Sequence, residues 1–267
     1  MKVRSESSLT YLFYSGNLSE AQRLLGRAPI APQSPVFEES TFLQVATMVL
    51  LGDLQEAKLL FERALRNQST SLLFRTRCRF FLGFGSSVKA DYKTASDYFS
   101  ENFEDFRKCE VSDSKDFLEV RFYTFQGRSF FQYIRGEFEQ ARDFALDSYA
   151  AAFEGEFIFG QVLALDLLGQ SNCRIGDIRR GMHELERALS LALTLGNGGI
   201  ATGLKIAMVT FEAQFGLGIP NAIDKLRSAI RDLDPQDIFS LPELYLELIR
   251  QLVLRGRGTE AQAHLDT

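Results

Sequence analysis

A short pattern of small, polar and apolar positions recurs seven times along the chain. A copy has a small residue, a polar residue, three variable positions and then a second small residue, which is alanine in all copies but one. The last two copies are weaker, and in the copy that ends at Ala222 the glycine has shifted by one residue to Gly218. The second small residues are Ala21, Ala57, Ala95, Ala141, Gly181, Ala222 and Ala261. Their spacings run from 36 to 46 residues and average 40. Recurrence at an average period of this length predicts internal structural repeats.

The residues around each copy predict two helices. Four residues after the second small residue the side chain is apolar, as at Phe61, Phe99 and Leu185, and seven residues after it the position is mostly small again. This is a helical period. The small residue that opens each copy, usually glycine, ends one helix, and the Asn or Asp that often follows can cap the next. Each repeat is therefore predicted to be a helix–turn–helix that buries its apolar face against its neighbours.

These features resemble the tetratricopeptide repeat family over about residues 2–267. The copies most similar to it are 51–65 and 167–177, and Leu168-Gly169 and Leu82-Gly83 match the Leu-Gly pair of its first helix. The repeats of this chain are longer than those of the family, which have about 34 residues, and the chain has no Trp. They are similar to the longer variety found in bacterial peptide-sensing regulators, regulatory halves of large transcription activators and long-peptide adaptors. The resemblance implies an all-α fold, a right-handed α-solenoid of about seven stacked helix–turn–helix repeats.

We expect residues 1–267 to form a single domain. The longest spacing, 46 residues, lies between Ala95 and Ala141 and includes the acidic stretch 101–116. It predicts either an extended helix followed by a loop, or a bend near 107–117 between blocks of three and four repeats. The final helix should have only about eight residues. Its short length would leave an apolar end at which a homodimer could form through the C-terminal repeat, with Leu246, Leu252, Val253 and Leu254 exposed.

Composition and charge exclude several classes of protein. The chain has 30 Lys and Arg against 35 Asp and Glu, a net charge of −5, which argues against direct binding of nucleic acid. The longest apolar stretch, 157–169, is too short for a membrane span of about 20 residues, and no signal peptide is recognisable at the N-terminus. We therefore expect a cytoplasmic protein that does not bind a membrane.

The sequence contains no constellation typical of catalysis or metal binding. The three cysteines and two histidines are scattered, which argues against a zinc site or a disulfide framework. His183 lies in an amphipathic helix among Glu184 and Glu186, where a solvated face is expected, and no nucleophile–base pair stands out. We expect no enzymatic activity, no metal and no cofactor. The arginines of two segments could meet an acidic partner or simply favour helix C-terminal ends. They are Arg174, Arg179 and Arg180 in one segment and Arg250, Arg255 and Arg257 in the other.

Phenylalanine is concentrated in the middle of the chain, because 17 of the 24 lie between Phe74 and Phe159. Two interpretations remain open: extra core volume for longer helices, or an aromatic groove.

In the tetratricopeptide repeat family the first helix of each repeat lines a concave groove that holds a peptide or helix of a partner. Counting back from the second small residues places the candidate groove positions at Phe80, Phe84, Gln126, Phe130, Tyr133, Asp166, Gln170, Arg174, Phe211 and Gln214. In the fourth repeat Arg128 stands where the family has Leu, which leaves the register of that repeat uncertain by one residue. The Lys and Asn residues that clamp C-terminal carboxylates in chaperone-binding members are absent from these positions.

The resulting functional hypothesis is a non-catalytic scaffold or adaptor that binds a peptide or helix of another protein in this groove. Phe84, Tyr133 and Arg174 are expected to contribute most to the affinity. The alternative is a ligand-sensing or peptide-sensing regulatory domain that controls a transcription or signalling protein.

Overall fold

The computed structural model describes residue 23 and residues 36–67, 70–216, 221–232 and 240–265. Within these ranges the chain is all-α, with twelve helices and no strand. The helices are α3 (Phe37–Leu50), α4 (Leu54–Asn67), α5 (Leu72–Val88), α6 (Tyr92–Arg107), α7 (Lys115–Ile134), α8 (Phe138–Glu154), α9 (Ile158–Ile175), α10 (Ile178–Thr194), α11 (Gly198–Phe215), α12 (Ala222–Asp232), α13 (Ser240–Leu254) and α14 (Gly258–Leu265). The first predicted repeat, around Ala21, lies outside the described residues.

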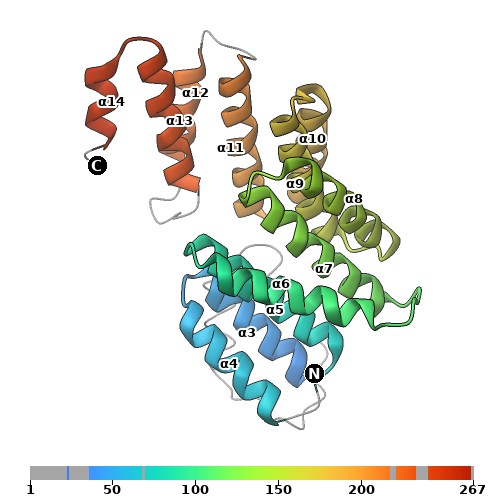
Figure 1. Cartoon of the computed structure of the whole chain (residues 1–267). Coiled ribbons are helices and arrows are strands. Elements are labelled where there is room, and N and C mark those ends of the chain that lie inside the picture. The colour runs from blue at the N-terminus through green and yellow to red at the C-terminus, as the bar shows by residue number, and fades with distance from the viewer. Residues whose placement is uncertain (1–22, 24–35, 68–69, 217–220, 233–239, 266–267) are drawn as a thin grey trace.

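The described helices form six pairs that stack in chain order (Figure 1). In each pair an odd-numbered first helix packs on an even-numbered second helix. Each first helix also packs on the first helix of the next pair, and each second helix packs on the next first helix. Successive pairs therefore build a helical-repeat solenoid, as the sequence predicts. The first helices α3, α5, α7, α9, α11 and α13 make one uninterrupted layer, whose surface is called the first-helix face below.

The turns within the repeats adopt the predicted left-handed backbone. The φ angles of Gly52, Gly136, Gly176 and Gly256 lie between 73° and 106°, a region that costs glycine little because it has no Cβ. Ala90 occupies the same place in its repeat with φ of 60°. Asp91 and Asp177 then cap the following helices through their side chains. The repeated pattern thus encodes the turn as well as the helices.

The second small residue of each repeat allows the paired helices to approach closely. Ala57, Ala95 and Ala141 are fully buried. In the α9–α10 pair, a Cβ on Gly181 would lie 2.6 Å from the carbonyl oxygen of Gly169. A larger residue at this position would push the two helices apart.

The register of the repeat built from α7 and α8 matches that of its neighbours. Ser129 lies twelve residues before Ala141, as Gly169 lies twelve before Gly181. The Ser129 hydroxyl donates to the Ala141 carbonyl over 2.7 Å, so these residues mark the close approach of α7 and α8. Arg128 therefore takes the place that Leu168 has in the next repeat, and no one-residue shift occurs.

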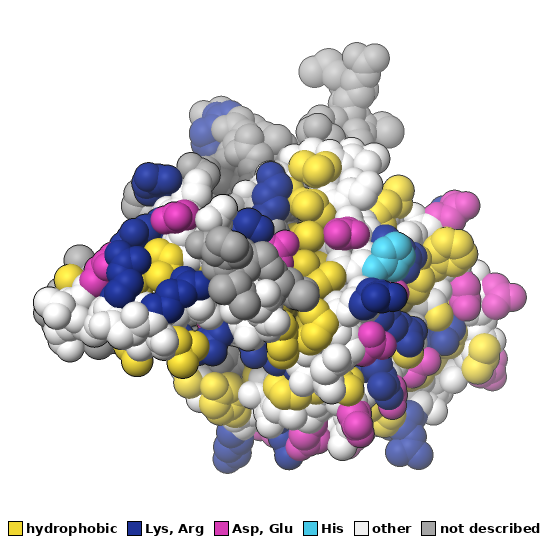
Figure 2. All heavy atoms as spheres, turned by 90° about the horizontal axis from the view of Figure 1, so that it is seen from above, with side chains coloured by type: hydrophobic (Ala, Val, Ile, Leu, Met, Phe, Trp, Pro, Cys, Tyr) yellow, Lys and Arg dark blue, Asp and Glu magenta, His cyan; other side chains and the backbone are white. Residues whose placement is uncertain are grey.

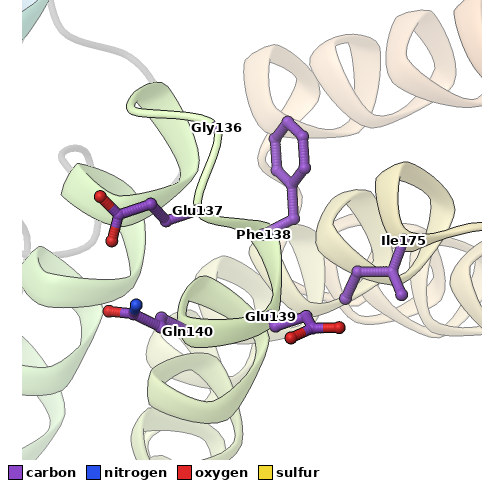
Figure 3. A pocket seen from close by; sticks show the side chains of 6 residues that line it. All are labelled: Gly136, Glu137, Phe138, Glu139, Gln140 and Ile175. Atoms are coloured by element: carbon purple, nitrogen blue, oxygen red, sulfur yellow. The ribbon is translucent and has the colours of Figure 1, made fainter.

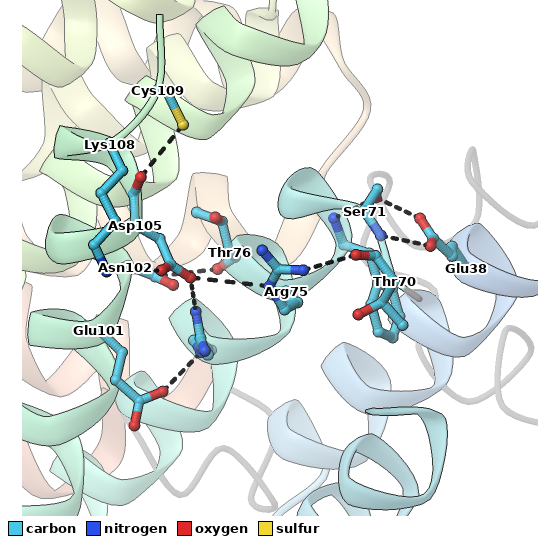
Figure 4. Close-up of polar contacts among 12 residues, drawn as sticks. Glu38, Thr70, Ser71, Arg75, Thr76, Glu101, Asn102, Asp105, Lys108 and Cys109 are labelled. Atoms are coloured by element: carbon cyan, nitrogen blue, oxygen red, sulfur yellow. Dashed lines mark hydrogen bonds and ion pairs between the residues drawn. The ribbon is translucent and has the colours of Figure 1, made fainter. Parts of the chain in front are cut away.

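The long spacing before this repeat is taken up by a loop and by a longer α7. Helix α6 ends at Arg107 after 16 residues, and α7 spans 20 residues from Lys115. The extended helix therefore follows the loop instead of preceding it. Polar contacts hold the end of α6 against α5. Arg79 donates to Asp105 over 2.8 Å, and the buried Asn102 donates to the Thr76 carbonyl over 3.0 Å (Figure 4).

Six of the 17 phenylalanines between Phe74 and Phe159 are buried: Phe74, Phe80, Phe81, Phe99, Phe122 and Phe159. Phe99, for example, is 1% exposed and lies between α5 and α7, and Phe122 is fully buried. Five further phenylalanines form an aromatic cluster that is half-buried between α6, α7 and α8. They are Phe103, Phe106, Phe117, Phe125 and Phe144. These contacts support the interpretation of extra core volume.

The C-terminal pair ends as predicted, with one correction. Helix α14 has eight residues, and Leu246, Val253 and Leu254 on α13 are exposed by 66%, 58% and 67%. Leu252, in contrast, is fully buried with Leu248 and Ala261, because it lies on the side of α13 that faces the core. Figure 2 shows Lys and Arg side chains gathered at the end of the molecule where these helices lie. None of the described helices is long and apolar enough to cross a membrane.

Candidate partner-binding site

The predicted groove residues all belong to first helices. Phe80 and Phe84 lie on α5, Gln126, Phe130 and Tyr133 on α7, Asp166, Gln170 and Arg174 on α9, and Phe211 and Gln214 on α11. Three of them are buried: Phe80 is 5% exposed, Gln126 3% and Phe211 2%. These three can support the first-helix face from beneath, and the other seven, which are half-buried or exposed, remain as candidates for contact with a partner.

Gln126 shows why a polar residue can be buried here. The Ser148 hydroxyl of α8 donates to its Oε1 over 2.8 Å, and its Nε2 donates to the Leu163 carbonyl of α9 over 2.9 Å. The amide thereby joins three helices. A buried amide that is satisfied on both sides fixes the relative position of the helices around it.

The aromatic part of the site lies where α5 meets α7. The rings of Phe84 and Phe130 are half-buried, and their centroids are 5.1 Å apart. Phe130 packs against the core on both sides of α7. The pair offers an apolar surface that is already ordered by its own packing.

The polar part of the site follows α9. Asp166, Gln170 and Arg174 are spaced by four residues and so lie on one helix face. The Gln170 amide donates to the Asp166 carboxylate over 2.8 Å. Asp166 and Arg174 are about 12 Å apart along the axis, from the rise of about 1.5 Å per residue.

Arg174 is exposed, yet it is held by two neighbouring first helices. Its Nε donates to the Tyr133 hydroxyl of α7 over 3.4 Å, and its Nη1 donates to the Gln214 Oε1 of α11 over 3.0 Å. Its guanidinium carbon lies 5.0 Å from the ring centroid of Phe211. These contacts bring together four residues that the repeat count had selected separately.

The row of contacts continues to α13 through Glu247 and Gln251, which the sequence analysis missed, and through Arg250, which it singled out but did not place in the groove. The Gln214 Nε2 donates to Glu247 over 3.2 Å, and Glu247 is 4% exposed. Arg250 donates to both carboxylate oxygens of Glu247, over 2.8 Å and 2.7 Å, and Gln251 donates over 2.9 Å. The hydrogen bonds to Glu247 raise the pKa of Arg250. The same backward count from Ala261 reaches Arg250, so the signal was present in the sequence.

A second charged row crosses the first helices nearer the N-terminus. Arg77 of α5 is 7% exposed, lies 2.6 Å from a carboxylate oxygen of Glu39 on α3, and lies 3.8 Å from Glu119 on α7. Its guanidinium covers the ring of Phe42 at 3.8 Å. Burial raises the pKa of Glu119, and the charge of Arg77 opposes that rise.

An open pocket lies beside the turn between α7 and α8. Its lining consists of Gly136, Glu137, Phe138, Glu139, Gln140 and Ile175 (Figure 3). Figure 3 shows the Glu137 and Gln140 side chains pointing away from Phe138 and Ile175. Phe138 also packs edge-on against Tyr133, with ring centroids 5.5 Å apart. Among the described residues, no group of three His, Cys, Asp or Glu side chains is placed to hold a metal ion.

The residues considered for other chemistry lie mostly as expected. His183 is exposed, and Cys78 and Cys173 are buried. Cys109 is half-exposed in the loop after α6 and is not helical. Glu184, the residue after His183, is 7% exposed and pairs with Arg187 at 2.5 Å.

Comparison with known proteins shows likeness at the level of the fold. No protein-family model matches the chain, and no curated protein sequence matches it. The crystal structure of a Rap protein complexed with competence and sporulation factor aligns over 99% of this chain and 74% of that chain, with 12% identity and a TM-score of 0.68. The crystal structure of BtubC (BKLC) from P. vanneervenii aligns over 86% of this chain and 88% of that chain, with 11% identity and a TM-score of 0.52. The chain thus has a helical-repeat fold that fits the tetratricopeptide type.

Proposed function

We propose that this chain is a non-catalytic interaction scaffold that binds a peptide or helix of another protein in a groove along the first-helix face. The observation that carries the proposal is the row of ordered contacts from Tyr133 through Arg174 and Gln214 to Glu247. It crosses four successive first helices and presents hydrogen-bonding groups next to the aromatic pair Phe84 and Phe130.

The physical argument is preorganisation. Peptide recognition needs apolar surface together with a few placed hydrogen-bonding groups. Side chains that already hold one another lose less conformational freedom when a partner arrives, and that saving favours binding. The Rap protein, which shares the fold, was crystallised with competence and sporulation factor, and this supports a binding role for the present chain.

The test is an affinity capture from native lysate with two matched triple variants. The site variant is Phe84→Ala/Tyr133→Ala/Arg174→Ala. The control variant removes the same residue types from second helices: Phe153→Ala/Tyr92→Ala/Arg179→Ala, all at exposed positions. A protein retained by wild type and control but lost from the site variant, with helical content preserved, supports the proposal. Equal recovery with all three proteins contradicts it.

A second candidate function is regulation by a bound ligand or peptide. The specific observation that favours it is that the row of contacts ties α7, α9, α11 and α13 together. A ligand that replaces these hydrogen bonds would change the angles between repeats and so the pitch of the solenoid. Small-angle X-ray scattering with and without the short bound segment of the captured partner separates the two candidates, because regulation requires a change in the radius of gyration larger than the segment itself adds, and a passive adaptor does not.

The exposed apolar side chains of α13 suggest a homodimer. We propose that Leu246, Val253 and Leu254 of one copy pack against the same residues of a second copy. Burial of apolar surface stabilises such an interface by about 25 cal/mol per Å². Analytical ultracentrifugation should then show a dimer that Leu246→Glu/Leu254→Glu converts to a monomer. A wild-type monomer at high concentration would contradict this.

A further inference from the structure

We infer that Arg174 is the receptor for a carboxylate of the bound partner. The inference rests on the proposed function, and it names the chemical group that the first-helix face recognises. Its starting point is an imbalance of charge along the row of contacts. Glu247 is neutralised by its two hydrogen bonds with Arg250, whereas the contacts of Arg174 in the described part of the chain are all with neutral groups.

Most other arginines on the packed surfaces of the described helices have an acidic partner. Arg77 pairs with Glu39, Arg79 with Asp105 and Glu101, and Arg187 with Glu184. Arg174 instead contacts the Tyr133 hydroxyl, the Gln214 side-chain amide and the aromatic ring of Phe211. Asp177, the carboxylate nearest to it in sequence, caps α10 by accepting from the Arg180 backbone N–H. One positive charge of the row is therefore left without a negative counterpart.

The neutral contacts orient the guanidinium group. Tyr133 accepts from Nε and Gln214 accepts from Nη1, while Gln214 is itself fixed at its other end by Glu247. No described contact occupies the N–H groups of Nη2. An arginine held in this way presents directed donors with little further ordering cost, and charge-assisted bonds from arginine to carboxylate are stronger than neutral ones.

The position of Arg174 agrees with a role in binding. The side chain is exposed on the first-helix face, at the C-terminal end of α9, whose helix dipole already attracts cations. A structural arginine would satisfy its charge inside the protein. An exposed arginine whose side chain is ordered by neutral groups can instead bind a negatively charged group of the partner. That group is the side chain of Asp or Glu, or a C-terminal carboxylate.

The experiment measures the peptide preference of the immobilised full chain. The probe is a library of N-acetylated decapeptides, prepared once with amidated C-termini and once with free C-termini. Four proteins are compared: wild type, Arg174→Glu, Arg174→Gln and Arg179→Glu. Arg179 is exposed on α10, so Arg179→Glu changes the net charge by the same amount as Arg174→Glu and serves as the matched control. Circular dichroism verifies that each variant is helical.

The expected result is that wild type and Arg179→Glu retain peptides with a carboxylate about tenfold over neutral ones, equivalent to about 1.4 kcal/mol. Arg174→Gln should lose this preference, and Arg174→Glu should reverse it toward Lys and Arg. Enrichment of Asp and Glu in the amidated set identifies a side chain as the source, and enrichment of the free-acid set identifies a C-terminus. An undiminished preference in Arg174→Glu, or peptide binding by wild type without any carboxylate preference, overturns the inference and leaves the proposed function standing. Wild type that retains no peptide of either set overturns both.

Discussion

The ring of Phe99 lies between two glycines, Gly83 of α5 and Gly127 of α7, and this arrangement yields a quantitative prediction. A Cβ on Gly127 would lie 2.5 Å from Cδ1 and 2.8 Å from Cε1 of Phe99. Overpacking of this kind costs about 1–3 kcal/mol, while Gly→Ala inside a helix gains about 1 kcal/mol. We expect Gly127→Ala to lower the free energy of unfolding by about 1 kcal/mol, since the steric term exceeds the gain in propensity.

Removal of the ring should reverse the sign of that change. In a Phe99→Val background the clashing ring atoms are gone, so Gly127→Ala keeps its helix propensity and adds about one buried methyl group, worth about 0.8 kcal/mol. The same substitution should then stabilise by about 1 kcal/mol or more, which makes the coupling energy about 2 kcal/mol. Gly203→Ala on α11 is the control, because a Cβ there meets nothing within 4 Å. It should stabilise by about 1 kcal/mol in both backgrounds.

The assay is urea unfolding followed by far-ultraviolet circular dichroism and by tyrosine fluorescence. Coincident transitions and unchanged m-values are needed before free energies are compared, because repeat arrays can unfold in several steps. If Gly127→Ala changed stability by the same amount with and without the Phe99 ring, the argument that Phe99 sets the distance between α5 and α7 would be refuted.

Three further predictions concern other parts of the molecule. Arg128→Leu should lower the free energy of unfolding by no more than about 1 kcal/mol, because the described contacts of this guanidinium are two aromatic rings; a larger loss in urea unfolding would contradict this. Burial raises the pKa of Glu119 above its ordinary value of 4.5. Between the pKa of the unfolded state and the raised pKa of the folded state, the folded protein holds a proton that the unfolded chain has released, so the free energy of unfolding falls as the pH rises through this interval. Glu119→Gln should lessen the fall in melting temperature from about pH 4 to about pH 7, and an identical profile would argue against it. Native protein should react rapidly with Ellman's reagent at one thiol, the half-exposed Cys109, whereas burial shields Cys78 and raises its pKa; Cys109→Ser should abolish the rapid phase.

The repeat pattern predicted the fold because each of its positions has a structural role that depends only on nearby residues. Glycine at the turn, a small residue at the close approach and an apolar residue one turn later act within a single helix pair. Their effects are therefore visible in the order of residues alone. The positive φ of Gly136 and the burial of Ala141 are direct consequences. Even the uncertain register around Arg128 is explained by one contact, from the Ser129 hydroxyl to the Ala141 carbonyl.

The surface of the site could be predicted only in part, because exposure depends on neighbouring repeats. The count placed Gln126 on the first-helix face, but Ser148 and Leu163, which bury it, belong to other helices. The same limit applies to Leu252, which belongs to an apolar run whose members differ in exposure from 0% to 67%. Pairing of charges between repeats, such as Arg77 of α5 with Glu39 of α3, is set by the stacking of the repeats and not by local sequence.

The central claim is that the first-helix face holds a segment of a partner protein, and site-specific photo-crosslinking tests it most directly. A benzophenone-bearing phenylalanine replaces either Gln170 on α9, in the middle of the proposed groove, or Phe153 on α8, which is 62% exposed on a second helix. Irradiation in native lysate should give a specific crosslinked protein from position 170 and none from position 153, with the crosslink mapped to one short segment of that protein. Crosslinks from position 153 alone, or the same products from both positions, would contradict the account.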